Sequence, residues 1–72
     1  MSDEVIIPGT LMTINDGRYK DVVLILKVDD KEILGKILSS TDEWTTIGKM
    51  ETFHPRIINM WRLSKEATFL FP

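Results

Sequence analysis

His54 is the one histidine of the sequence and its first candidate for acid–base chemistry. An unperturbed imidazole titrates at about pH 6.5, and Glu51 stands three residues earlier, so the two side chains could share a proton-transfer role. The proline directly after His54 favours another interpretation, a histidine in a polar corner of the chain that takes no part in catalysis. We expect the second interpretation to hold.

The acidic segment at residues 29–32 is a candidate metal site. Alternate side chains of an extended chain share a face, so Asp30 and Glu32 could point the same way beside Asp29. Calcium requires about six or more oxygen ligands, usually from a loop that a glycine organises, and this segment has no glycine. We therefore expect a solvated hairpin turn and no metal site.

Other catalytic motifs are absent. The sequence has no cysteine, which excludes a thiol nucleophile, a disulfide framework and a cysteine-ligated zinc site. Its four glycines are widely separated, so they form no phosphate-binding loop, and no metalloprotease or serine-hydrolase motif occurs. We expect a protein that is not an enzyme and binds no cofactor.

Basic and aromatic residues lie together in two parts of the chain. Arg18, Tyr19 and Lys20 are consecutive, and residues 49–65 carry four basic residues against one acidic residue, interleaved with aromatic side chains. Small barrels bind single-stranded nucleic acid by stacking bases on aromatic rings in a basic groove. The net charge of −2 opposes binding to phosphates. Nucleic-acid binding is therefore the alternative function, through Arg18, Tyr19, Lys20, Arg56 and Arg62.

Tryptophan, tyrosine and arginine are the residue types that dominate protein–protein interfaces. A core of this size does not obviously accommodate every aromatic side chain of the sequence, so we expect at least one to be exposed. Trp61 is expected in the core, whereas Trp44, beside two acidic residues, could be exposed or buried. The predicted partner-binding residues are Trp44, Lys49, Phe53, Arg56, Arg62, Phe69 and Phe71.

The length of 72 residues limits the chain to a single domain, residues 1–72. Its longest apolar run, residues 22–26, is too short to cross a membrane, and residues 1–8 lack the basic start of a signal peptide. The absence of cysteine is typical of a cytoplasmic protein. We expect a complete small cytoplasmic protein without a membrane partner, whose residues 1–4 form a solvated end.

Alternating apolar residues predict several short strands. Asn15-Asp16-Gly17 indicates a hairpin turn between a strand ending near Ile14 and a clear strand at residues 18–28. In that strand Val22, Leu24, Leu26 and Val28 alternate on one face, and the other face is apolar only in its centre. We expect most of Val22, Leu24 and Leu26 to be buried in the core or in a partner. A two-residue turn at Asp29-Asp30 then leads to a strand at residues 32–38, where Gly35 predicts a bend or bulge. A further strand is expected at residues 44–47, which could bend at residues 48–49 and continue to Phe53.

Two interpretations compete for residues 55–66. Pro55 could begin a helix that buries Ile57, Ile58 and Trp61 against a sheet, giving an α+β fold. Alternatively, residues 55–59 form one 3₁₀ turn and residues 60–64 a strand, which we favour because adjacent isoleucines and an asparagine are poor helix formers. The final run at residues 67–71 is too apolar to be free. We expect it to pair with residues 5–7 or with a second copy of the chain.

Short strands separated by regular turns predict an all-β fold, a small barrel of five or six antiparallel strands. Their order, with meandering strands, one helical turn and a last short strand, resembles the SH3-like small barrel. Within it, Met12-Thr-Ile-Asn-Asp-Gly-Arg-Tyr-Lys20 is similar to the opening of a KOW motif. The similarity extends over residues 12–28, with Val23 where that family has its second glycine, and it implies binding to RNA or RNA polymerase.

These features predict a non-catalytic protein-interaction module. We expect a small regulator or inhibitor, phage- or operon-encoded, that docks on a larger protein complex and could form a homodimer through its C-terminal strand. The alternative is a nucleic-acid-binding small barrel that acts in transcription or RNA metabolism.

Overall fold

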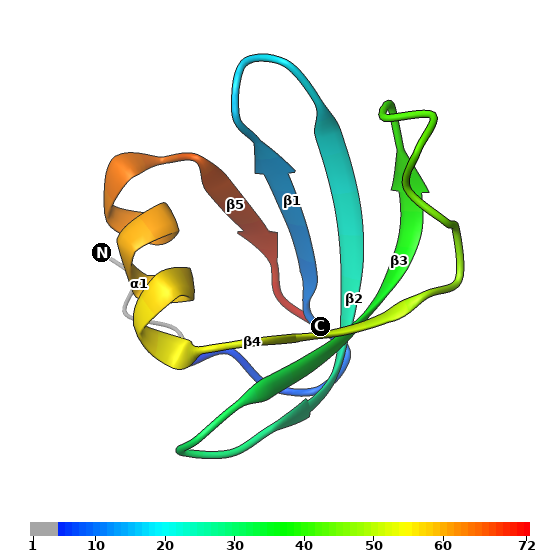
Figure 1. Cartoon of the computed structure of the whole chain (residues 1–72). Helices are drawn as coiled ribbons and strands as arrows, with labels where there is room; N and C mark the ends of the chain where they lie inside the picture. Colours follow the sequence, from blue (N-terminus) through cyan, green and yellow to red (C-terminus); the bar gives the residue numbers. More distant parts are fainter. Residues whose placement is uncertain (1–4) are drawn as a thin grey trace.

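A single antiparallel sheet dominates the computed structural model, which describes residues 5–72 (Figure 1). Its five strands lie in the order β4-β3-β2-β1-β5, so β4 and β5 are the two edges. The fold is mostly β, as expected, and the predicted solvated end at residues 1–4 lies outside the described residues. The elements are β1 (Leu11–Asn15), β2 (Lys20–Val28), β3 (Ile33–Ser40), β4 (Met50–Phe53), α1 (Pro55–Ser64) and β5 (Ala67–Leu70).

The turns on either side of β2 are both organised by an aspartate side chain. Asp16 Oδ1 accepts hydrogen bonds from the backbone N–H groups of the residues two and three positions later, at 2.8 and 2.9 Å. Asp29 Oδ1 accepts the equivalent pair, both at 2.8 Å. The predicted hairpin at Asn15–Gly17 is confirmed, and Gly17 adopts the positive φ of 90° that such a turn favours. The second turn has four residues, 29–32, and not the two expected.

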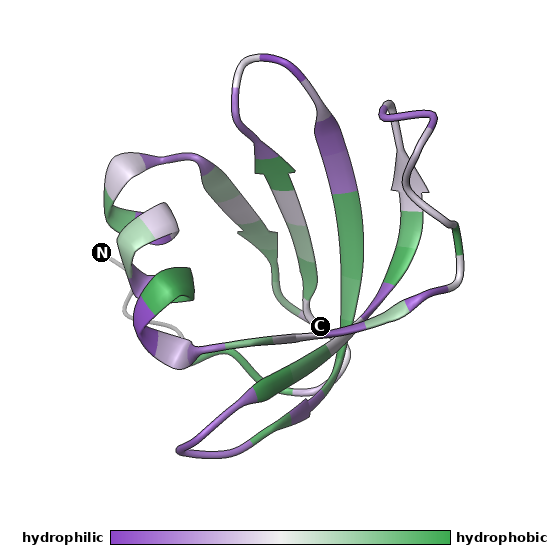
Figure 2. Cartoon of the chain, in the orientation of Figure 1, coloured by the Kyte–Doolittle hydropathy of each residue, from purple (hydrophilic) through white to green (hydrophobic). Residues whose placement is uncertain are grey.

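Figure 2 shows these turns largely in the colours of hydrophilic residues and the middle of β2 in the colour of hydrophobic residues. The sheet curves there because the pairing of β2 with β3 contains two irregularities, one between Val22 and Val23 and one between Ile25 and Lys27. Gly35 lies opposite Ile25, between these irregularities, and is buried. The expected bend or bulge around this glycine is confirmed.

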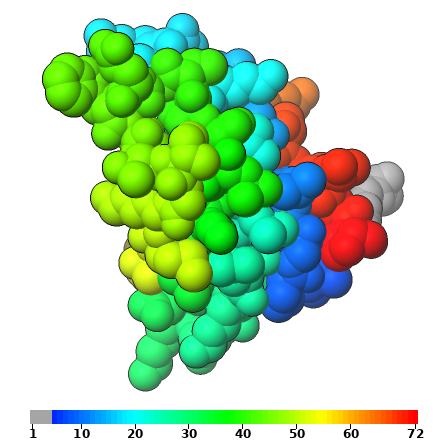
Figure 3. Space-filling model, turned by 90° about the vertical axis from the view of Figure 1, so that its right-hand side faces the viewer, coloured from blue at the N-terminus to red at the C-terminus, as the bar shows by residue number. Residues whose placement is uncertain are grey.

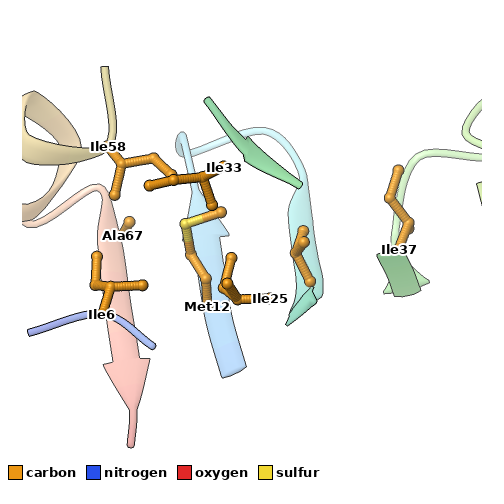
Figure 4. Packing of buried hydrophobic residues seen from close by; sticks show 8 residues of the cluster. Ile6, Met12, Ile25, Ile33, Ile37, Ile58 and Ala67 are labelled. Atoms are coloured by element: carbon orange, nitrogen blue, oxygen red, sulfur yellow. The ribbon is translucent and has the colours of Figure 1, made fainter. Parts of the chain in front are cut away.

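The hydrophobic core lies between the inner face of the curved sheet and α1. In β2 its members are Val23 and Ile25, whereas Leu24 remains half-buried on the opposite face. Val22, Leu24 and Leu26, most of which were expected to be buried, are thus only half-buried, whereas Val28, beyond the irregularity after Ile25, packs against the core. A strand that is apolar on both faces has no alternation to show which face meets the core, so the choice depends on packing against the rest of the chain. Figure 4 shows this cluster, which comprises Ile6, Met12, Val23, Ile25, Ile33, Ile37, Ile58 and Ala67.

Residues 55–64 form a helix, so the favoured 3₁₀ turn at 55–59 and strand at 60–64 were wrong. The alternative helix was right, except that Ile57, expected to be buried, is exposed. Pro55 occupies the start of the helix, where its missing N–H costs nothing. Ile58 is buried in the core, and Trp61, one turn later, packs against it. This tertiary packing outweighs the weak helix propensity of the segment.

The strand at residues 44–47 and the pairing of the C-terminal strand differ from the predictions, although the C-terminal strand itself forms and a strand does end at Phe53. Residues 44–47 lie in consecutive turns, and the strand begins only at Met50. The C-terminal strand β5 pairs with β1 of its own chain, for example Phe69 with Met12, and does not pair with residues 5–7. The apolar C-terminal run is thus used to extend the sheet.

Candidate interaction surface

The predicted partner-binding residues fall into separate regions. Trp44 and Lys49 belong to the loop between β3 and β4, whereas Phe69 and Phe71 belong to the C-terminal end of the chain. Figure 1 places that loop and α1 at opposite sides of the molecule. The seven predicted residues therefore do not form a single patch.

Trp44 is the most exposed aromatic residue of the described chain, with 85% of its surface accessible. Its backbone is nevertheless held in place, because its N–H donates to Asp42 Oδ1 at 3.0 Å. The hydroxyl of Thr45 donates to the other oxygen of Asp42 at 3.1 Å, and the Asp42 N–H donates to Ser40 Oγ at 3.0 Å. Figure 3 shows this loop projecting at one corner of the molecule. The fold thus presents a large apolar side chain to solvent from an ordered turn.

Arg62 packs over the aromatic rings at the end of the chain. Its guanidinium carbon lies 5.4 Å from the ring centroid of Phe69 and 5.4 Å from that of Phe71. The two rings stack with centroids 6.1 Å apart, and both pack against the core. Arg62 therefore contributes cation–π contacts inside its own fold.

Phe53 and Trp61 also have an internal packing role. Their ring centroids lie 6.0 Å apart in an edge-on arrangement, and both rings contact the core. The expectation that Trp61 belongs with the core is confirmed. Lys49, in contrast, is exposed and forms an ion pair with Glu51 at 3.7 Å, a contact that contributes little to stability at the surface.

The five nucleic-acid candidates do not form one surface either. Arg18 and Tyr19 lie in the turn between β1 and β2, whereas Arg56 lies in the first turn of α1. Figure 1 shows these two segments at opposite ends of the sheet. Moreover, the two aromatic residues within the strands, Phe53 and Phe69, both face the core and leave no ring on the sheet surface for base stacking.

His54 has a structural partner. Its Nδ1 accepts a hydrogen bond from the backbone N–H of Arg56 at 3.1 Å, which makes His54 the N-cap of α1.

The acidic turn at residues 29–32 uses a carboxylate to bind its own backbone. Hydrogen bonds from the N–H of Glu32, and then from that of Lys31, lower the pKa of Asp29. Within residues 5–72 no group of three or more metal-ligating side chains could hold a metal ion.

The outer face of the sheet carries a mostly apolar row of residues across all five strands. Leu70, Leu11 and Leu24 lie opposite one another on β5, β1 and β2, and the row continues through Lys36 to Met50. We call these five residues the outer row. They point away from the core because their strand neighbours, such as Met12 and Val23, are buried. Leu70 is 68% exposed.

Charged side chains of the strands are segregated by face. Three lysines, Lys20, Lys27 and Lys36, lie on the outer face; we call them the strand lysines. The two acidic residues of the strands, Asp21 and Glu51, lie on the other face, where Asp21 accepts a hydrogen bond from the Ser40 hydroxyl. On the outer face the charged strand residues are thus all positive, although the chain as a whole is acidic.

No family model matches the chain, and neither a curated protein nor a solved structure matches it significantly. The resemblance of residues 12–28 to a KOW motif therefore gains no support from these comparisons. No helix in the described part of the chain is long and apolar enough to span a membrane.

Proposed function

We propose that this domain is a non-catalytic protein-interaction module that docks on a larger protein and uses Trp44 as an anchor. The observation that carries the proposal is the exposure of Trp44 on a turn fixed by Asp42. Burying a tryptophan gives a large apolar contact, and a backbone ordered beforehand reduces the entropy lost on binding.

Neighbouring residues extend this anchor. Ile47, in the same loop, and Met50, at the start of β4, are 54% and 51% exposed. Lys49 lies between them and offers a charge at the rim. Of the seven predicted partner-binding residues, Trp44 and Lys49 are thus the primary candidates for direct contact. The aromatic residues Phe53, Phe69 and Phe71 support the domain from inside.

Affinity enrichment with matched baits tests this function. Wild-type protein, Trp44→Ala and Thr46→Ala would be immobilised and exposed to extract from the host, and bound proteins would be quantified by mass spectrometry. We expect at least one protein that the wild-type and Thr46→Ala baits retain and the Trp44→Ala bait loses. Thr46 is an exposed residue of the same loop, so this variant controls for disturbance of the loop. Identical protein sets on all three baits would contradict the proposal.

We also propose that the sheet is an SH3-like small barrel in which a ten-residue helix replaces the usual 3₁₀ turn. Support comes from the order of the elements: four meandering strands, a helical segment, and a last strand that returns beside β1. Backbone hydrogen exchange measured by NMR tests it. Slow exchange at both β4 and β5 is expected if these edge strands are protected, and rapid exchange along β4 would argue for an open sheet.

A further inference from the structure

We propose that the outer face of the sheet is a second contact surface, and that its occupant is a protein surface that is apolar in the middle and rich in aspartate and glutamate around it. This inference rests on the proposed function, because it names the chemistry of the protein partner. Its test changes Lys27, Lys36 and Leu70, which lie outside the Trp44 anchor, so failure of this inference is distinguishable from failure of the proposed function.

The apolar part of the surface is the first observation. In an antiparallel sheet with one solvated face, outward residues are normally polar. Here Leu11, Leu24 and Leu70 of the outer row are adjacent on three neighbouring strands. The helix α1 places Ile58 in the core on the other side of the sheet and leaves this face uncovered by any helix or strand of the described residues. Figure 3 shows the surface where β2 and β3 reach solvent.

The charge of this surface specifies its partner. The strand lysines all lie on the outer face, and the two carboxylates of the strands lie on the inner face. The chain as a whole carries more acidic than basic residues, so the positive charge of this face does not follow from the overall composition. Complementary charge at the edge of an interface increases the association rate and suppresses wrong partners, so a carboxylate-rich partner fits best.

Two other occupants fit less well. Packing two outer faces together would bring the strand lysines of both copies into one interface with no strand carboxylate between them, which disfavours a second copy. A nucleic acid would match the charge, but the outer row contains leucines and a methionine in place of aromatic rings. Both remain outcomes of the test.

A phage-displayed random dodecapeptide library is the probe. It would be selected on wild-type protein, and enriched peptides would be synthesised and their affinities measured by fluorescence anisotropy. We expect the peptides to combine leucine, isoleucine or aromatic residues with aspartate or glutamate. Their affinity should fall about tenfold or more in K27E/K36E and remain near wild type in K31E/K65E, which changes the net charge equally at positions outside the strands.

A second matched pair tests the apolar contact. Leu70→Ser removes an exposed leucine from the outer row, and Leu63→Ser removes an exposed leucine from α1. Because both side chains are mostly in solvent, both variants should fold, which circular dichroism checks. The inference requires that Leu70→Ser weakens peptide binding and that Leu63→Ser does not.

Several results would overturn the inference. These are a library that enriches nothing, peptides without acidic residues, or equal effects of the two charge variants. Concentration-dependent dimerisation that Leu70→Ser abolishes would assign the face to a second copy. Binding of an oligothymidine probe that K27E/K36E abolishes would assign it to nucleic acid. Peptides that require Trp44 but tolerate K27E/K36E would remove this inference and leave the proposed function standing.

Discussion

Gly35 of β3 lies so close to Val23 of β2 that a Cβ atom at position 35 would overlap Cγ1 of Val23. The same atom would be 3.4 Å from Cε2 of the Phe53 ring. Val23 and Phe53 approach from the two strands that flank β3, so the glycine lets both pack over its backbone where the sheet bends.

Gly35→Ala should therefore destabilise the protein by about 1–3 kcal/mol, because the added methyl group overpacks the core. Urea unfolding followed by circular dichroism measures the change. Val23→Ala removes the clashing atom, so in a double-mutant cycle the combined variant should lose less stability than the sum of the two single losses. Strict additivity would contradict the close contact.

Local signals explain which parts of the fold could be predicted. The hairpin at Asn15–Gly17 follows from turn chemistry within a few residues, and so did the bend at Gly35. The preference for a turn and strand over the helix at Pro55–Ser64 was wrong, because the helix is stabilised by Ile58 and Trp61 packing against strands that are distant in the sequence. The buried face of β2 could not be predicted for the same reason, since both faces of that strand are apolar.

Sequence patterns also limit what could be known of the interaction surface. Trp44 was identified by residue type, but its exposure depends on Asp42 and Ser40 holding the loop away from the core. The outer row could not be found in advance, because it requires the register of five strands that are separate in the sequence. Segregation of the strand lysines becomes visible only once that register is known.

The two tryptophans should report opposite environments in single-tryptophan variants. Trp61→Phe leaves Trp44, whose emission should be red-shifted, strongly quenched by acrylamide and almost unchanged on unfolding. Trp44→Phe leaves Trp61, whose emission should be blue-shifted and should move to the red on unfolding, because its ring packs against the core.

The two tryptophans should also differ in how much each contributes to the free energy of unfolding. Trp44→Ala should change the free energy of unfolding by less than about 0.5 kcal/mol, whereas Trp61→Ala should lower it by about 2–3 kcal/mol, since its ring is only partly buried. Denaturant titration of both variants measures the difference. A loss of several kcal/mol in Trp44→Ala would show that this side chain is part of the core and would remove the proposed anchor.

His54 should contribute to stability as a helix cap. His54→Ala removes the acceptor for the Arg56 N–H and should cost about 1 kcal/mol, measured by urea unfolding. His54→Asn supplies another acceptor at the same position and should restore most of this loss. If both variants are equally destabilised, the imidazole has a role other than capping.

Stability at low pH should depend on the two turn aspartates. Hydrogen bonds from backbone N–H groups, first that of Tyr19 for Asp16 and that of Glu32 for Asp29, lower the pKa of each carboxyl below its ordinary value. A carboxyl whose pKa is lower in the folded state stabilises the fold above its ordinary pKa. This stabilisation disappears as the pH falls through the folded-state value. The unfolding free energy of the wild type should therefore decrease as the pH is lowered from about 6 to about 2.

The variant D16N/D29N isolates this effect. An asparagine oxygen accepts the same backbone hydrogen bonds but carries no titrating charge, so the turns should persist while this part of the pH dependence is lost. Urea unfolding at each pH should give a shallower decline for the variant than for the wild type. A second variant, D30N/E43Q, removes one exposed acidic residue from the turn of Asp29 and one from the loop between β3 and β4, and it controls for the change in net charge. Equal declines in the wild type and D16N/D29N would show that the two carboxylates do not stabilise the turns through their charge.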